Sequence, residues 1–185
     1  AALRLCLLVF VLAPVVVVIL VSVTDQAFVS LPKHRISFQH YAVLFGSDRW
    51  MDAAFRSLLV ALSATALATI VGALCAIGAW QVRSRLGAVI RAAMLLPLIV
   101  PVVVQALGLY RLYIPLGLMD TFTGISIAQA VLGLPYIVIA TSAALSQVDR
   151  RIEQAARSLG AGPLETTLRV IVPAASPGIV SGALI

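Results

Sequence analysis

Long stretches without a charged side chain are the feature that most constrains this chain. Four of them lie at residues 5–23, 57–82, 92–110 and 125–145, and a fifth runs from residue 170 to Ile185. A helix needs about 20 consecutive apolar residues to cross the roughly 30 Å hydrocarbon core of a bilayer. The first four stretches therefore predict four membrane-spanning helices. The fifth, 170–185, is too short for a complete span, so we expect the chain to be truncated within it.

The composition favours a polytopic membrane protein over a soluble domain. Hydrophobic residues make up 62% of the chain and charged residues 11%, whereas soluble domains carry about 25% charged residues. We therefore expect an all-α fold with a single transmembrane domain over residues 1–185. A signal peptide is the rival interpretation of the first stretch, but its apolar core would be only about 7–15 residues long. The chain begins with Ala1 rather than Met, so we expect the natural N-terminus to lie upstream.

The basic residues predict an orientation. If the N-terminus is cytoplasmic, eight of the 13 lie on the inner side and five on the outer side. The inner ones also lie in shorter loops, where the positive-inside rule applies best. The inner set is Arg4, Arg83, Arg85, Arg91, Arg150, Arg151, Arg157 and Arg169, and the outer set is Lys33, Arg35, Arg49, Arg56 and Arg111. These residues lie singly at the edges of apolar runs, which speaks against nucleic-acid binding.

Residues 24–56 form the longest predicted extramembrane loop, which this orientation makes periplasmic. It contains aromatic residues such as Tyr41 and Trp50, which are typical of the bilayer surface because their rings are amphipathic. Contact with another protein is an equally good interpretation, and both can hold. His34 and His40 lack partners at metal-ligand spacing, and Cys6 and Cys75 lie inside apolar runs, so we expect no metal site and no disulfide.

Two predicted spans carry features that bear on packing and bending. In span 57–82, small residues recur from Ser63 through Gly72 to Gly78, which lets neighbouring helices approach closely. Span 92–110 contains Pro97 and Pro101, and each proline frees a carbonyl and bends the axis. The bends are either static kinks or flexible points of a moving transporter.

A few polar side chains interrupt the apolar spans. Gln105, Gln129 and Tyr136 are candidates for a translocation pathway, because polar groups at membrane depth tend to face the bundle interior or a water path. Gln129 and Tyr136 share one helical face around a Gly133-Leu134-Pro135 break. Hydrogen bonding between helices is the competing interpretation of each residue, and it is the more common role.

Residues 146–169 form a polar loop that predicts a helical hairpin. Apolar residues from Val148 to Leu159 recur at helical spacing, and Ser146 or Asp149 is suited to cap the start of this amphipathic helix. Gly160 is suited to close its end, because only glycine adopts a left-handed backbone without steric cost. Pro163 then fits the first turn of a second helix, which we expect to run to Pro173.

This segment resembles the cytoplasmic loop of the permease subunits of binding-protein-dependent ABC importers. The family signature is Glu-Ala-Ala, three residues, Gly, nine residues, Ile, one residue and Leu-Pro. Gln154-Ala155-Ala156 is followed at the same intervals by Gly160, Val170, Val172 and Pro173. Gln154 replaces the signature glutamate, with Glu153 one position earlier.

The resemblance extends to the spermidine/putrescine-type permeases. The LLPLIVP sequence of the third span and the SFQHYAVLF segment before the second span are similar to stretches of these proteins. The resemblance implies a helix bundle of the MetI-like permease type in a bacterial inner membrane. It also leaves the solute open, because related permeases carry iron, thiamine, phosphonates or sulfate.

The resemblance implies a mechanism and a set of partners. The helix at 149–159 would be a coupling helix between spans four and five that docks on a separate dimeric ATPase subunit. A second permease subunit, usually of different sequence, and a periplasmic solute-binding protein would complete the transporter, which needs no cofactor in this chain. The residues that this assigns to the ATPase interface are Arg150, Glu153, Gln154, Ala155, Ala156, Arg157, Leu159 and Gly160.

Three other functions compete with this one. The chain has no phosphate-binding loop, since Gly160-Ala161-Gly162-Pro163 lacks the lysine, and no catalytic residues are evident. An ion-gradient-driven carrier or channel would want an ionisable group at membrane depth, which the five apolar stretches lack. A DNA-binding hairpin would use Arg150, Arg151 and Arg157, but we expect its apolar face to lie against the flanking spans. A structural subunit without a pathway is the third alternative.

Overall fold

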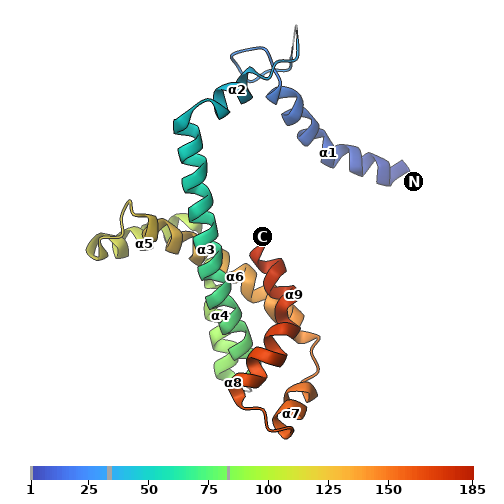
Figure 1. Cartoon of the computed structure of the whole chain (residues 1–185), viewed down its shortest axis with the longest axis vertical. Coiled ribbons are helices and arrows are strands. Elements are labelled where there is room, and N and C mark those ends of the chain that lie inside the picture. Colours follow the sequence, from blue (N-terminus) through green and yellow to red (C-terminus); the bar gives the residue numbers. More distant parts are fainter. Residues whose placement is uncertain (1, 33–34, 83) are drawn as a thin grey trace. The chain divides into compact units, whose positions relative to one another are not determined.

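The structure is a computed structural model that describes residues 2–32, 35–82 and 84–185, and every regular element within them is helical. Lys33, His34 and Arg83, which entered the sequence analysis, lie outside the described residues. The elements, labelled in Figure 1, are α1 (Ala2–Ser22), α2 (Gln39–Phe45), α3 (Asp48–Gln81), α4 (Arg85–Ile99), α5 (Val102–Leu116), α6 (Phe122–Ser146), α7 (Arg151–Ser158), α8 (Pro163–Thr166), the π-helical turn η1 (Thr167–Ile171) and α9 (Val172–Ala183).

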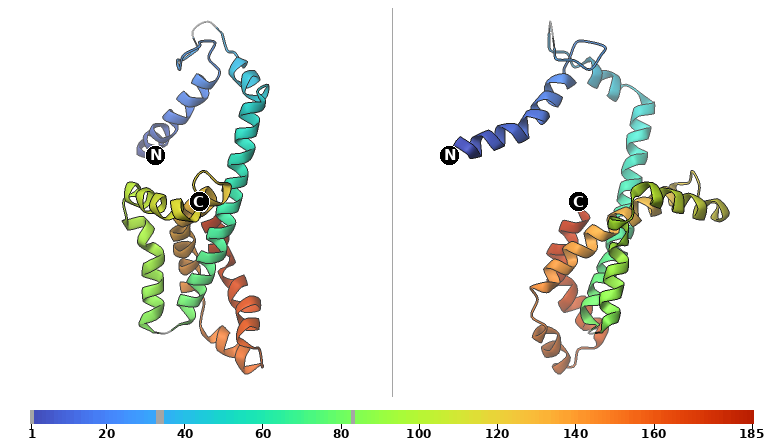
Figure 2. Two further views of the ribbon diagram at one scale, coloured as in Figure 1. Left: turned by 90° about the vertical axis from the view of Figure 1, so that its left-hand side faces the viewer. Right: turned by 180° about the vertical axis from the view of Figure 1, so that it is seen from behind.

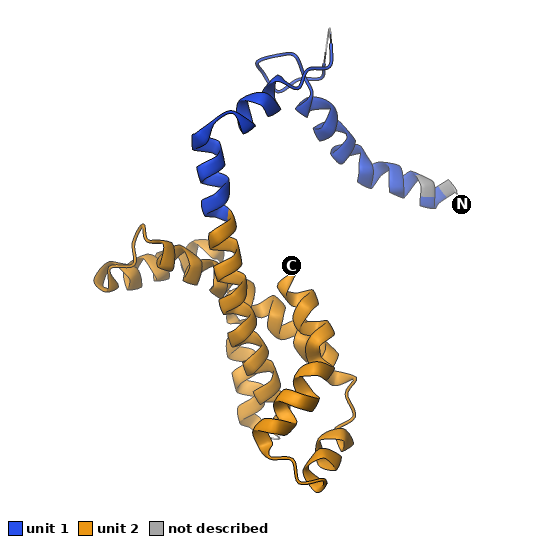
Figure 3. Ribbon diagram, viewed as in Figure 1, with its two compact units in different colours: residues 1–57 blue, residues 58–185 orange. Residues whose placement is uncertain are grey.

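The chain divides into an N-terminal unit, residues 1–57, and a C-terminal unit, residues 58–185 (Figure 3). In the N-terminal unit, the segment after α1 folds back onto the end of that helix. The Ser37 N–H donates to the Val23 carbonyl at 2.9 Å, and the Tyr41 hydroxyl donates to Ser22 Oγ at 2.9 Å. The predicted loop over 24–56 is therefore anchored to α1 rather than free.

Less of the predicted loop 24–56 is irregular than expected, because two helices form within it. It includes α2, and α3 begins at Asp48 instead of near Ser57. No proline or glycine interrupts the chain between these two residues, and Asp48 places a carboxylate in the first turn, where it favours the helix dipole. The polar start of α3 thus continues the helix beyond its apolar part.

Small side chains pack α3 into the C-terminal unit, as predicted. Ala64, Ala68 and Ala73 are buried together with Ala130 and Ile137 of α6. Figure 2 shows α6 lying alongside α9, and a Cβ atom at Gly182 of α9 would lie 2.9 Å from the Ile137 Cα atom. Since that is closer than Cβ atoms normally approach backbone, glycine is what lets α9 come so near to α6.

The predicted third span, 92–110, is not one helix. It is divided between α4 and α5, whose axes differ by 105°. The break lies at Val100, whose backbone is extended at φ −75° and ψ 127° because a residue before proline disfavours the helical conformation. Pro101 also has no N–H to donate to the Pro97 carbonyl, so the helix cannot continue across it.

Two other expected interruptions do not occur. Pro135 is buried within α6, which continues through Gly133-Leu134-Pro135 without a break. The second helix of the hairpin does not stop at Pro173, because α8, η1 and α9 follow one another directly. In η1 the Val172 N–H donates to the Thr167 carbonyl, five residues back, and this π-helical turn brings the chain to Pro173 in helical conformation.

The helices agree in part with the predicted spans. Among the described residues, α3 and α6 are long and apolar enough to cross a membrane, and α4 with α5 makes a third if the bent pair is one span. The apolar part of α1, Cys6–Ser22, is shorter than α3 and α6. The loop after α5 is only Gly117–Thr121 instead of the expected 110–124, because α5 runs to Leu116.

Candidate functional site

The hairpin between α6 and α9 places α7 outside the apolar bundle. The N-cap residue of α7 is Arg150, and Asp149 Oδ1 just before it accepts the Arg151 N–H at 2.8 Å. Asp149 thus bonds to the start of the helix from one position earlier than a cap, whereas Ser146 belongs to α6 and donates to the Ala143 carbonyl. At the other end Gly160 has φ +90°. The Ala161 N–H donates to the Ala156 carbonyl and the Gly160 N–H to the Arg157 carbonyl, which is the Schellman pattern of a helix end.

The apolar side chains of the hairpin are exposed. Leu159 is 90% exposed, Leu164 is 72% exposed and Ile152 is 48% exposed. The expectation that the apolar face lies against the flanking spans holds for Val148, which packs against the core of the bundle, but is wrong for Ile152 and Leu159. An open hollow of about 470 Å³ lies along α8 and η1, lined by Leu164 and Leu168 among others. Exposed apolar side chains of this kind make the hairpin a candidate interaction surface.

Most charges on the hairpin are paired within it. Arg157 Nη2 lies 2.7 Å from Glu153 Oε1, and Arg169 Nη1 lies 2.8 Å from Glu165 Oε1. Both pairs join residues four apart on one helix face. Of the predicted interface residues, Gln154 and Ala155 are exposed and Ala156 is half-buried. The hairpin thus presents apolar, neutral polar and basic groups, with the carboxylates of Glu153 and Glu165 paired to arginines.

The end of α3 contacts the hairpin, which the sequence analysis missed. The Arg150 guanidinium carbon lies 4.6 Å from the centroid of the Trp80 ring, so this predicted interface residue is stacked on another helix of its own chain. Gln81 Nε2 donates to Thr167 Oγ1 at 3.0 Å. The sequence signal was weak, since it consisted only of an aromatic and an amide at the end of the apolar stretch 57–82.

The pathway candidates lie in different surroundings. Gln129 is exposed on α6, and Tyr136 on the same helix is 43% exposed. Gln105 instead bonds to its own chain, since its Nε2 donates to the carbonyls of Pro97 at 2.7 Å and Val100 at 2.8 Å. It therefore satisfies carbonyls that the break between α4 and α5 exposes.

One polar contact between spans was not among the candidates. Ser63 Oγ of α3 and Ser126 Oγ of α6 lie 2.8 Å apart. Such a contact is the common role of hydroxyl groups at membrane depth.

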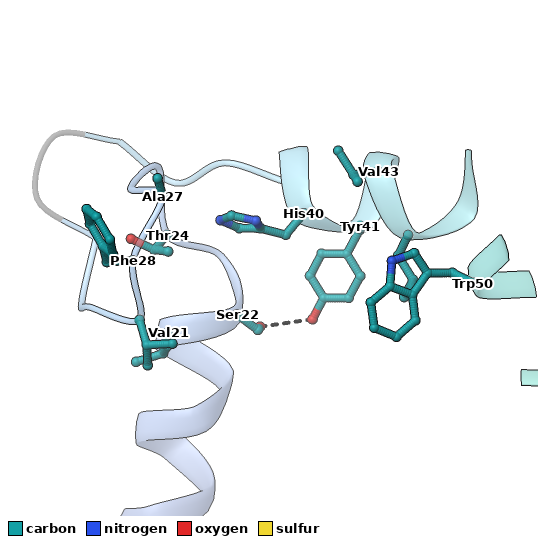
Figure 4. Close-up of a pocket in the computed structure, with 11 residues that line it drawn as sticks. Val21, Ser22, Thr24, Ala27, Phe28, His40, Tyr41, Val43 and Trp50 are labelled. Carbon is teal, nitrogen blue, oxygen red and sulfur yellow. Dashed lines mark hydrogen bonds between the residues drawn. The ribbon is translucent and has the colours of Figure 1, made fainter. Parts of the chain in front are cut away.

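The N-terminal unit holds a separate hollow of about 560 Å³, lined mainly by apolar side chains. Figure 4 shows the Tyr41 hydroxyl reaching Ser22, with Trp50 and His40 also lining the hollow. His40 Nε2 lies 3.1 Å from the Gln26 carbonyl, so this histidine has a backbone partner. No three His, Cys, Asp or Glu side chains in the described parts of the chain form a group that could hold a metal ion.

Apolar helices of spanning length, joined by a hairpin that holds an amphipathic helix outside the bundle, define a polytopic helical membrane protein. Residues 68–185 match the family described as the inner membrane component of binding-protein-dependent transport systems. The chain belongs to this family.

Individual relatives agree with this assignment. The chain is 30% identical over 172 residues to the spermidine/putrescine transport system permease protein PotC of Haemophilus influenzae, covering 93% of this chain and 66% of the relative. It is 30% identical over 184 residues to the molybdenum transport system permease protein ModB of Mycobacterium bovis, covering 91% and 70%. The trehalose transport system permease protein SugB of Mycobacterium tuberculosis is 27% identical over 150 residues, covering 81% and 55%. The chain thus spans slightly less than two thirds of the length of PotC.

Proposed function

We propose that this chain is the permease subunit of an ATP-driven importer, which forms the translocation pathway and receives motion from a separate ATPase subunit. The observation that carries the proposal is α7, a helix of eight residues held outside the bundle and closed by Gly160 at φ +90°. The sequence there also follows the family signature. A short rigid helix with exposed apolar side chains fits a cleft in a partner and passes the partner's displacement to the helices joined to it.

The solute that fits best is a polyamine or another small solute delivered by a periplasmic binding protein. Support comes from the relatives named for spermidine and putrescine, which cover more than nine tenths of this chain. Other relatives are named for trehalose and molybdenum. A second permease subunit would pair with this chain, and the exposed Gln129 and Tyr136 would then face the space between the two subunits.

The orientation follows from the same proposal. Figure 1 shows the end of α3, the start of α4 and the hairpin at one end of the C-terminal unit, so Arg85 at the start of α4 and the hairpin arginines lie on the same side. The positive-inside rule makes that side cytoplasmic, where an ATPase has access to ATP. With the predicted spans, the N-terminus would then lie in the cytoplasm.

Purification of the tagged chain from its native membrane tests the assembly. We expect an ATPase subunit and a second permease subunit to come with it. In proteoliposomes, we expect uptake of radiolabelled spermidine that needs both ATP inside the vesicle and the binding protein outside. Uptake driven by an ion gradient without ATP would instead favour a carrier, and purification without an ATPase would contradict the proposal.

A labelling experiment tests the orientation. A cysteine introduced at Arg157 should react with a membrane-impermeant thiol reagent only after the cytoplasmic side is opened, in a chain whose Cys6 and Cys75 are replaced by alanine. Reaction in intact cells would place the hairpin outside and would overturn the proposed coupling.

A further inference from the structure

The last turn of α3 holds the hairpin at two points. Trp80 lies under the Arg150 guanidinium, at 4.6 Å, and Arg150 directly precedes α7. The next residue, Gln81, donates its amide N–H to Thr167 Oγ1 at 3.0 Å, and Thr167 begins η1. Two consecutive residues of one helix therefore hold the entry and the exit of the hairpin.

The contact at Trp80 is built into the core of the C-terminal unit. Trp80 is 7% exposed and is buried together with Leu145 of α6, Ile171 of η1 and Ala175 of α9. Its ring is thus fixed on several sides, while Arg150 lies on it and is half-buried. A guanidinium over an indole face is attracted by the ring quadrupole, and the attraction is stronger where water is excluded.

The contact at Gln81 has consistent donors and acceptors. Thr167 Oγ1 donates its only proton to the Pro163 carbonyl at 2.9 Å and accepts the Gln81 amide N–H with a lone pair. Pro163 is the first residue of α8. A continuous hydrogen-bonded chain therefore runs from the end of α3, through Thr167, to the start of the second hairpin helix.

We propose that Trp80 and Gln81 are positioning residues that clamp α3 to the hairpin, so that α3 moves as one body with α7. The inference rests on the proposed function, in which the hairpin receives the motion of the ATPase. The polypeptide connects the hairpin directly to α6 and α9, whereas three helices, α4, α5 and α6, lie between α3 and the hairpin. Through the clamp, a displacement of the hairpin reaches α3 directly. The contact between Ser63 and Ser126 then transmits this displacement along the α3–α6 interface.

A pair of spin labels tests the clamp in the complex as it purifies from the membrane. One label replaces Ser158 at the end of α7, and the other replaces Leu74, which is 62% exposed on α3. Cys6 and Cys75 are first changed to alanine. The distance between the labels is measured by pulsed electron resonance without nucleotide and after trapping with ATP and vanadate. We expect one narrow distance that is the same in both states.

Two sets of variants separate the clamp from general stability. Trp80→Leu combined with Gln81→Leu should broaden the distance distribution at least twofold. The control variant, Trp80→Phe combined with Thr167→Ser, keeps an aromatic face and a hydroxyl and should retain the narrow distribution. A Trp80→Leu/Gln81→Leu chain that purifies normally and gives the native distribution would overturn the clamp. So would a native distance that changes between nucleotide states.

The two proposals fail in different ways. If no ATPase accompanies the chain, the proposed function fails, but the width of the nucleotide-free distribution still tests the clamp through the two sets of variants. If the ATPase is present and the leucine variant keeps a narrow distribution, the clamp alone fails. In that case the hairpin moves α6 and α9 without holding α3.

Discussion

The carboxylate of Glu153 accepts a hydrogen bond from the Arg157 guanidinium at 2.7 Å, one helical turn further along α7. Glu153 is the acidic residue next to Gln154, which stands where the family signature has glutamate. Because Glu153 is already paired, it does not replace the missing charge at position 154. The surface around Gln154 therefore has no unpaired carboxylate from Glu153, while Arg151 one turn earlier is exposed. We expect Gln154 itself to bind a partner through amide hydrogen bonds.

Removing this ion pair should change the free energy of unfolding very little. The Arg157 side chain is 50% exposed and the Glu153 side chain 17% exposed, and pairs that remain accessible to water contribute about 0–1 kcal/mol. We expect Glu153→Gln to lower the free energy of unfolding by less than ~1 kcal/mol, and by still less in 0.5 M salt than in ~0.05 M salt, because salt screens exposed charges. Thermal unfolding in detergent at the two salt concentrations measures this, with Glu165→Gln as the matched control. A large effect that salt does not reduce would show that Glu153 has another partner.

Substitution of Gly160 should disconnect the hairpin from transport. A side chain at φ +90° clashes with its own backbone and costs about 1–2 kcal/mol, which would deform the end of α7. We expect Gly160→Val to keep ATP hydrolysis in the purified complex and to lower spermidine uptake by about tenfold or more. Gly160→Asn is the matched control, since asparagine tolerates the left-handed conformation best among the other residues. Unchanged uptake with Gly160→Val would contradict the role of α7 as a rigid lever.

Two glycines offer a matched test of helix packing in the bundle. A Cβ at Gly182 would lie 2.9 Å from the Ile137 Cα and 3.3 Å from the Ala140 Cβ, whereas a Cβ at Gly78 would meet no atom within 4 Å. We expect Gly182→Ala to lower the thermal unfolding temperature in detergent, because overpacking costs about 1–3 kcal/mol. Gly78→Ala should leave it the same or raise it slightly, since alanine favours helix. Equal effects at the two positions would show that α9 does not approach α6 this closely.

The sequence predicted those parts of the fold that depend on local rules. Charge-free stretches predicted α6 and the end of α3 within a few residues, because a helix in lipid must satisfy its own backbone. They did not predict the start of α3 at Asp48, since its first turns are polar. The role of Gly160 was also predictable from a local rule, because it depends only on the conformation of its own backbone and on the amphipathic stretch before it. In the hairpin, spacing alone was enough to predict a helix, a glycine turn and a second helix.

The effects of the prolines were predictable only in part. The bend predicted at Pro101 is present, whereas Pro97 lies inside α4 without a break. Pro101 breaks a helix, Pro135 lies buried inside one, and Pro173 follows a π-helical turn. Whether a proline breaks a helix depends on which groups take over the freed carbonyl, and at Pro101 this group is the side chain of Gln105. The contact of Arg150 with Trp80 was equally hidden, because it joins residues far apart in the sequence that no periodicity relates.

At the break between α4 and α5, the stabilising effect of the Gln105 side chain depends on the presence of Pro101. Gln105 Nε2 donates to the carbonyls of Pro97 and Val100, and the Pro97 carbonyl lacks its normal helical donor because Pro101 has no N–H. Gln105→Leu leaves both carbonyls without this donor, and each unsatisfied group costs about 1–3 kcal/mol. We expect this variant to lower the free energy of unfolding in detergent by ~2 kcal/mol or more.

Replacing the proline should remove most of that cost. In Pro101→Ala, residue 101 regains an N–H that donates to the Pro97 carbonyl, so Gln105→Leu should destabilise this background much less than the native chain. The four chains form a double-mutant cycle, and we expect a coupling free energy of about 1–2 kcal/mol between the two positions. Gln105→Glu extends the test, because an ionised carboxylate offers no proton to the two carbonyls and should destabilise the native chain at least as much as leucine does. Additive effects of Pro101→Ala and Gln105→Leu would mean that Gln105 does not stabilise the break, and its amide would then be available to the translocation pathway.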